Sequence, residues 1–537
     1  MERKNINKKD VAPKTTKNTK AEETKYESKP AKKKSKIKLA IIAITIILAV
    51  LLIVLIPKLF NKKESFKDKA TYTTSFFIKN KEGKYALYNE DGKQKSKFAF
   101  DSTYNFINGS ALVYKESDGY AIIDEKGKNI VPYGMYNYVS SYSGLYKVRS
   151  DIGYKLLNNK GKTIIEAKDM DVNSYGEDYP FVVVSTDKEV IIYSFDADKI
   201  LTLKKGDSKD TPKINHVDEI ATIFYNGENI LFNSRTKKII SRFKNKQHYC
   251  VSGYTENKKV YTLNACASWF ETVSEKGHKI VIKGQETDLS KDCNNFAVYD
   301  NTVLCYKDGG YYFINTSNKK AKLGKKLGSR SAFIDEDNYV IRNEKDYKLD
   351  FYKNGKKIKS IEANIASNNK SNNNLYLLYV DSGYEFYNKD GKKAIKESFR
   401  YASGFDKNGR ARVSKDGKLY YLIDEKGKEK SKKYSNITYY DEYYEVTNKD
   451  NKKGIISKDG KVIVPTKYDI IGLRKVRDTY YALASKDSSS YALYNVTNNK
   501  LVLETKDKMV INDHYVKTSG NKESYYTLKG KLFYKEK

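Results

Sequence analysis

Residues 111–132 read ALVYKESDGYAIIDEKGKNIVP, and the repetitive part of the chain follows their pattern. The stretch holds three short apolar runs separated by polar turns, at residues 111–114, 120–124 and 129–131. Runs of this length between turn residues are typical of strands. The Lys126-Gly127 pair can close a tight hairpin at positive φ, because glycine adopts this conformation at little steric cost. The sequence therefore predicts a unit of three short antiparallel strands.

The same unit recurs on both sides of this stretch. A tyrosine opens the middle run of most copies, and a glycine closes the turn that follows; the first three tyrosines are 35 and 34 residues apart. The repeat tyrosines are Tyr85, Tyr120, Tyr154, Tyr347, Tyr384 and Tyr420. The turn glycines are Gly92, Gly127, Gly161, Gly355, Gly391, Gly427 and Gly460. A period of this size is typical of propellers and arrays, and the chain has room for about 13 units.

One such unit cannot bury its own apolar face, so neighbouring units must stack on it. We expect an all-β repeat domain of two β-propellers with three- to four-stranded blades, because about 13 units exceed the roughly eight blades usual for one ring. The two halves are predicted at residues 74–310 and 311–537, with the boundary between the rings near residues 290–330. An open β superhelix is the alternative arrangement.

An unbroken apolar run, Leu39 to Ile56, precedes the repeats. Counted on to Phe60, it reaches the roughly 20 residues that a helix needs to cross a bilayer core of about 30 Å. We therefore predict a transmembrane signal anchor at residues 39–60 and a linker at residues 61–73. A cleaved signal peptide is the alternative, but its apolar region is usually about 7–15 residues long and ends in a small-residue cleavage pattern that is missing here.

The flanks of the apolar run predict its orientation. Residues 1–38 carry 14 Lys/Arg and 5 Asp/Glu and almost nothing apolar. Such a segment is typical of a disordered basic tail, and basic flanks stay on the cytoplasmic side of the membrane. We expect a single-pass protein of the cell membrane with its N-terminus in the cytoplasm and its C-terminal ectodomain outside the cell.

The whole chain is strongly basic, with a net charge of +34 at pH 7. A basic surface can attract anionic polymers. Outside a cell we expect no nucleic acid as a partner, and a phosphate-rich wall polymer fits better. The abundance of Lys, Asn, Ile and Tyr also fits coding bias of an AT-rich genome, which needs no specific partner.

Four cysteines, Cys250, Cys266, Cys293 and Cys305, fall within one stretch of the chain. An even number outside the cytoplasm predicts disulfides, and three pairings are possible. The pairing closest in sequence joins Cys250 to Cys266 and Cys293 to Cys305. His248 and His278 lie nearby in sequence, but the spacing does not fit a zinc site, so we predict no metal and no cofactor.

At the turns, the chain resembles the WG-repeat family of bacterial proteins. Residues 450–468 match its unit best, through Gly454, the Asp459-Gly460-Lys461 turn and the final Lys467-Tyr468. The resemblance covers residues 81–165 and 380–470, although tyrosine replaces the family's tryptophan in most units. It implies a repeat scaffold, often at the cell surface, and transfers no catalytic residue.

The expected function is therefore binding. No spacing of histidines, serines or glycines indicates a hydrolase elbow, a zinc protease or a phosphate loop. We predict a membrane-anchored extracellular scaffold that binds a cell-wall polymer or a surface protein and is not an enzyme. A single-pass sensor of an extracellular ligand is the first alternative. A surface glycosidase is the second, because paired carboxylates meet in space rather than in sequence.

Overall fold

The computed structural model describes residues 73–536 apart from 174–180, 195, 206–211, 258, 267–276, 317–320, 329, 344, 367–368, 371 and 488. Contacts divide the chain into two compact units, Met1–Lys63 and Glu64–Lys537. The predicted basic tail at residues 1–38, the signal anchor at residues 39–60 and residues 61–72 of the linker lie outside the described residues. Within the described part, no helix is long and apolar enough to span a bilayer.

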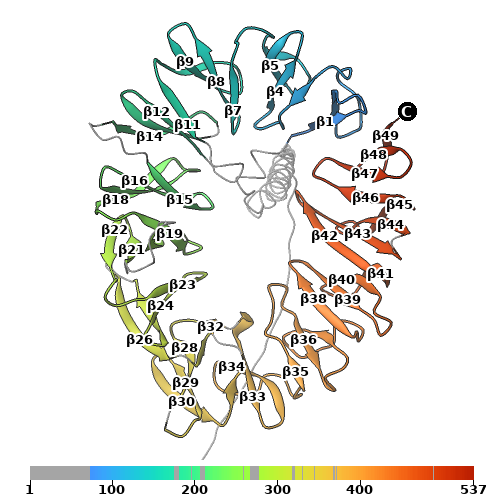
Figure 1. The fold of residues 1–537 in the computed structure, drawn as a ribbon. Helices are drawn as coiled ribbons and strands as arrows, with labels where there is room; N and C mark the ends of the chain where they lie inside the picture. Colours follow the sequence, from blue (N-terminus) through green and yellow to red (C-terminus); the bar gives the residue numbers. More distant parts are fainter. Residues whose placement is uncertain are drawn as a thin grey trace, which may run out of the picture. The chain divides into compact units, whose positions relative to one another are not determined.

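The described residues form 13 antiparallel sheets, numbered here in chain order (Figure 1). Nine of them have four strands that follow the chain order from one edge to the other. Sheets 1 to 4 are β1 (Ser75–Lys79) and β2 (Tyr85–Asn89); β3 (Ser102–Thr103), β4 (Ser110–Lys115), β5 (Gly119–Asp124) and β6 (Asn129–Val131); β7 (Val139–Tyr142), β8 (Leu145–Ser150), β9 (Gly153–Leu157) and β10 (Thr163–Ala167); β11 (Met170–Asn173), β12 (Phe181–Thr186), β13 (Glu189–Ser194) and β14 (Lys199–Lys204).

Sheets 5 to 8 lie in the middle of the chain, where the sequence period is least regular. They are β15 (Lys213–Val217), β16 (Ile220–Tyr225), β17 (Glu228–Asn233) and β18 (Lys238–Lys244); β19 (Tyr249–Tyr254), β20 (Val260–Ala265), β21 (His278–Ile282) and β22 (Gln285–Asp288); β23 (Asn295–Tyr299), β24 (Thr302–Lys307), β25 (Gly310–Asn315) and β26 (Lys322–Gly328); β27 (Ser331–Phe333), β28 (Asn338–Arg342), β29 (Leu349–Lys353) and β30 (Lys356–Ile361), with β32 (Asn369–Lys370) added in parallel to β27.

Sheets 9 to 13 complete the array. They are β31 (Asn364–Ile365), β33 (Leu375–Val380) and β34 (Gly383–Asn388); β35 (Tyr401–Ala402), β36 (Ala411–Ser414) and β37 (Tyr421–Ile423); β38 (Asn436–Tyr440), β39 (Tyr443–Thr447), β40 (Lys453–Ser457) and β41 (Val462–Tyr468); β42 (Ile470–Val476), β43 (Thr479–Lys486), β44 (Ser490–Asn495) and β45 (Lys500–Thr505); β46 (Lys508–Ile511), β47 (Tyr515–Ser519), β48 (Glu523–Thr527) and β49 (Leu532–Lys535). A short 3-10 helix, η1 (Asn372–Asn374), precedes β33.

The middle strands of the sheets carry the apolar runs. In sheet 2, Leu112 and Ile122 are almost fully buried on one side, and Ala111 and Ile123 on the other. Side chains alternate between the two faces of a strand, so each sheet contributes to two hydrophobic clusters, one with each neighbour. This explains why the runs are continuously apolar rather than alternating.

A hydrophobic cluster joins every pair of successive sheets, and a further one joins sheet 13 to sheet 1. In that last cluster, Phe76 and Tyr88 of sheet 1 pack against Tyr525 and Phe533 of sheet 13. Beside it, the Arg477 guanidinium pairs with Glu90 and donates to the Thr73 carbonyl at 2.9 Å. The sheets therefore close into one ring (Figure 1).

The prediction of two rings is wrong, and so is the alternative of an open superhelix. The predicted boundary near residues 290–330 falls at sheets 7 and 8, which share a core through Leu304, Phe313 and Phe333. The division between residues 310 and 311 falls inside β25. The prediction relied on the roughly eight blades usual in one propeller, and this ring has thirteen sheets. The sequence period gives the number of units but does not determine how many units form one ring.

Candidate functional site

The seven turn glycines all adopt positive φ, between 70° and 82°. The Lys126-Gly127 turn differs from the prediction, because only its glycine has positive φ; both residues of the Asn354-Gly355 turn do. The Lys126-Gly127 turn also depends on a side chain three residues before its glycine. Asp124 Oδ1 accepts the backbone N–H groups of Lys126 at 2.9 Å and Lys128 at 2.8 Å.

The same arrangement recurs at Asn158, Asn388 and Asp424. Such a side chain stabilises a turn because its oxygen takes up N–H groups that the bend leaves without strand partners. Sequence reasoning missed this residue, although an Asn or Asp three positions before five of the seven turn glycines was a visible signal.

Five of the six repeat tyrosines pack half-buried against the clusters between sheets: Tyr85, Tyr120, Tyr154, Tyr384 and Tyr420. They contribute to the core.

Tyr347 is different, because 65% of it is exposed and it has a positive φ of 58°. It lies eight residues before its turn glycine, where the others lie seven. The prediction that Tyr347 is a repeat tyrosine is therefore wrong.

The cysteines form the pairs Cys250–Cys266 and Cys293–Cys305, with Cα–Cα distances of 5.2 and 5.5 Å. The first pair links β19 to the residue that follows β20, and the second links the loop before β23 to β24. Disulfides persist in oxidising compartments, so they indicate that this part of the chain lies outside the cytoplasm.

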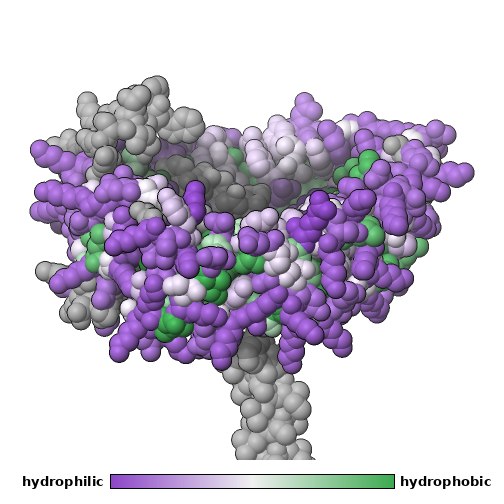
Figure 2. Space-filling model, turned by 90° about the horizontal axis from the view of Figure 1, so that it is seen from below, coloured by the Kyte–Doolittle hydropathy of each residue, from purple (hydrophilic) through white to green (hydrophobic). Residues whose placement is uncertain are grey.

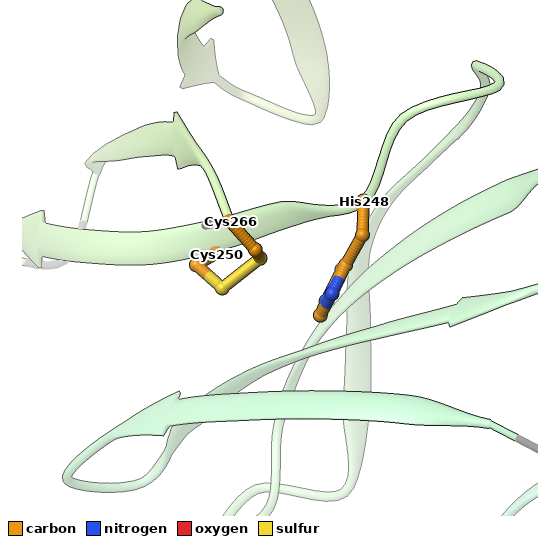
Figure 3. Close-up of side chains that lie close together, drawn as sticks. All are labelled: His248, Cys250 and Cys266. Carbon is orange, nitrogen blue, oxygen red and sulfur yellow. A yellow bond between two sulfur atoms is a disulfide. The ribbon is translucent and has the colours of Figure 1, made fainter. Parts of the chain in front are cut away.

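His248 lies beside the Cys250–Cys266 disulfide (Figure 3). Both sulfur atoms are bonded to each other, so they are not available as thiolate ligands of a metal. Burial lowers the pKa of His248 to about 4, and the ring stacks on Phe224 with centroids 5.7 Å apart. The histidine is therefore neutral near pH 7 and packs as part of the sheet interface.

Replacing Cys250 and Cys266 together with serine should lower the free energy of unfolding. The bridge closes a loop of 16 residues, for which the chain-entropy model gives about 3 kcal/mol. Denaturant unfolding followed by the fluorescence of Trp269, three residues after Cys266 in sequence, measures this effect. The Cys293→Ser/Cys305→Ser variant is the matched control for general loss of a disulfide. A Cys250/Cys266 variant as stable as the unaltered chain, under oxidising conditions, would contradict the expectation.

A pocket of about 630 Å³ between sheets 7 and 8 gathers basic side chains. Lys326 of β26, Arg330 after it and Arg342 at the end of β28 line the pocket together with Tyr347. None of its described lining residues is acidic. Such a pocket is expected to attract an anion, because its described lining carries three basic side chains and no acidic one.

Arg342 is the most informative residue of this basic pocket. Its guanidinium carbon lies 5.1 Å from the centroid of the Tyr347 ring, and its backbone N–H donates to the Arg330 carbonyl at 3.2 Å. Its Nε is buried and has no hydrogen-bond partner among the residues that the structure describes. A buried N–H without a partner is costly, and the oxygen of a bound phosphate or carboxylate would remove that cost.

Comparisons with known proteins give a family match for one segment. No curated protein matches the sequence. Solved structures that match include BamB from Moraxella catarrhalis, at 8% identity over 57% of this chain and 90% of that chain with a TM-score of 0.24. A eukaryotic initiation factor matches at 10% identity over 73% of this chain and 95% of that chain, with a TM-score of 0.27. We draw no conclusion from scores this low.

The family model described as WG containing repeat matches residues 386–418. The match lies inside the region, residues 380–470, where the sequence resembles WG repeats. It begins in β34 of sheet 9 and ends after β36 of sheet 10, so one sequence repeat spans parts of two sheets. Residues 386–418 are therefore a WG-containing repeat.

Proposed function

We propose that this protein is a membrane-anchored extracellular scaffold that binds an anionic cell-wall polymer and catalyses no reaction. The observation that carries the proposal is the basic pocket with the buried Nε of Arg342. Arginine suits phosphate and carboxylate groups, because its planar guanidinium presents several N–H donors in a fixed geometry. The apolar run at residues 39–56 supports the membrane anchor.

The surface of the ring fits a polar rather than an apolar partner. The face shown in Figure 2 is covered mainly by hydrophilic residues, with small separate hydrophobic patches. Protein interfaces usually have a hydrophobic core, so this face offers less to a protein partner than to a charged polymer. The two disulfides support a place outside the cytoplasm, where such a polymer would be encountered.

The test is retention of the full chain on immobilised polyphosphate. At about 0.1 M salt we expect retention, and at about 1 M salt elution, because the screening length falls from about 10 to about 3 Å. Replacing Arg342 with glutamine should weaken binding about ten- to a hundredfold, since a charge-assisted hydrogen bond contributes about 1.5–3 kcal/mol.

Arg400→Gln is the matched control, because Arg400 is exposed and does not line the basic pocket. It removes the same charge and should leave binding nearly unchanged. Retention that persists at about 1 M salt would count against the proposal. So would an equal effect of the two substitutions, which would indicate attraction by net charge alone.

A further inference from the structure

A second pocket, of about 540 Å³, lies between sheets 10 and 11 and differs from the basic pocket in its chemistry. Its floor is apolar and consists of the buried residues Phe405, Leu422, Ile437 and Tyr444. Part of its lining, including Phe405, belongs to the WG-containing repeat. A pocket of this size with an apolar floor is within the range of small-molecule sites.

Polar groups of both kinds surround this floor. Asp406 supplies a hydrogen-bond acceptor, and Arg412 supplies donors. The ring of Tyr439 completes the rim, with 38% of the residue exposed and its centroid 5.7 Å from that of Tyr444. The lining thus combines an aromatic surface, a carboxylate and a guanidinium within one pocket.

The carboxylate of Asp406 is held in place by its neighbours. Its Oδ1 accepts the backbone N–H groups of Asn408 at 2.8 Å and Arg410 at 3.1 Å, and its Oδ2 accepts the hydroxyl of Tyr444 at 2.6 Å. Each carboxylate oxygen has two acceptor positions, so Oδ1 is fully used by the two N–H groups and Oδ2 keeps one position for a ligand hydroxyl. The group is therefore preorganised as an acceptor.

The side chain of Arg412 is also held in place by its neighbours. Its Nη1 donates to the Ile437 carbonyl at 2.6 Å, and its Nη2 donates to the Tyr401 hydroxyl. Its guanidinium also lies over the ring of Tyr420, with 5.4 Å between the guanidinium carbon and the ring centroid. A guanidinium has five N–H donors, so these contacts hold the side chain without using all of them.

We propose that this second pocket binds an uncharged sugar ring. A pyranose has an apolar face that packs on aromatic and aliphatic side chains, and hydroxyls at its edge that both donate and accept. The lining matches this pattern, with the exposed ring of Tyr439 for the ring face and Asp406 and Arg412 for the hydroxyls. The pocket carries charges of both signs, Asp406 beside Lys407 and Arg412, whereas the described lining of the basic pocket carries positive charges alone. The proposal does not depend on polymer binding at the basic pocket.

Binding of neutral tetrasaccharides to the full chain tests the sugar proposal. Maltotetraose, cellotetraose and tetra-N-acetylchitotetraose serve as probes, with saturation-transfer NMR to detect contact and titration calorimetry to measure affinity. We expect saturable binding of at least one. Tyr439→Ala should weaken it about tenfold, and Asp406→Asn, which keeps an acceptor oxygen for the turn, should also weaken it.

Tyr440→Ala is the matched control. Tyr440 is the next residue of β38 and is 44% exposed, but it does not line the pocket. It should bind as the unaltered chain does. The proposal is overturned if none of the three sugars binds saturably, or if the two tyrosine variants lose affinity equally. Polyphosphate retention of the Tyr439→Ala variant, measured in parallel, should stay unchanged.

Discussion

Alanine in place of Gly460 is expected to lower the free energy of unfolding by about 3 kcal/mol or more. Gly460 has a φ of +76°, and a Cβ there would lie 1.9 Å from the carbonyl oxygen of Lys430. The left-handed conformation alone costs an L-residue about 1–2 kcal/mol. The clash adds to this, because Lys430 belongs to the segment after β37 and a backbone carbonyl cannot rotate away. Denaturant unfolding measures the loss.

Gly355→Ala separates the two causes. Gly355 has nearly the same φ, +73°, but apart from its two chain neighbours no heavy atom of the described residues lies within 4 Å of the position that its Cβ would take. Its replacement should cost only the conformational part, about 1–2 kcal/mol. If the two variants lost equal stability, the close approach of sheets 10 and 11 at Lys430 would be disproved.

Phe76→Ala should destabilise the protein by about 3–5 kcal/mol, the usual cost of removing a buried phenylalanine. Phe76 is 6% exposed and lies where sheet 1 meets sheet 13, with its ring centroid 5.2 Å from that of Tyr515 and 5.8 Å from that of Phe533. No peptide segment links these two sheets directly, so their contact depends on side chains. Amide hydrogen exchange should therefore accelerate in both β1 and β47.

Phe333→Ala is the control for this experiment. Phe333 is fully buried between sheets 7 and 8, where the chain itself runs from one sheet to the next. Its loss should cost a similar free energy but accelerate exchange in sheets 7 and 8. A Phe76→Ala protein with unchanged exchange in β46–β49 would show that the ring is not closed by this contact.

Local features of the fold were predictable from the sequence, and long-range features were not. The glycine turns follow from residue chemistry, because positive φ is accessible to Gly127 or Gly460 at little cost. The number of rings depends on the angle between neighbouring sheets, and no residue type encodes that angle alone. Tyr347 was misassigned because an insertion of one residue preserves the look of the repeat while it moves the side chain to the surface.

The candidate sites illustrate the same limit. The four cysteines predicted disulfides, but the sequence left three pairings open, and the structure selects one by bringing Cys250 to Cys266 and Cys293 to Cys305. Arg342 and Tyr439 carry no sequence signal among many other basic and aromatic residues. Each is distinguished only by the neighbours that another sheet provides.

Since Phe76 packs against Phe533, the array begins and ends at the same place. The chain can therefore start at a different sheet while the sheets keep the same order around the ring. A circularly permuted chain, cut at the Asn354-Gly355 turn and joined from Lys537 to residue 73 by a short flexible segment, retains every contact between sheets. The packing of the sheets therefore does not require the array to start at one particular sheet.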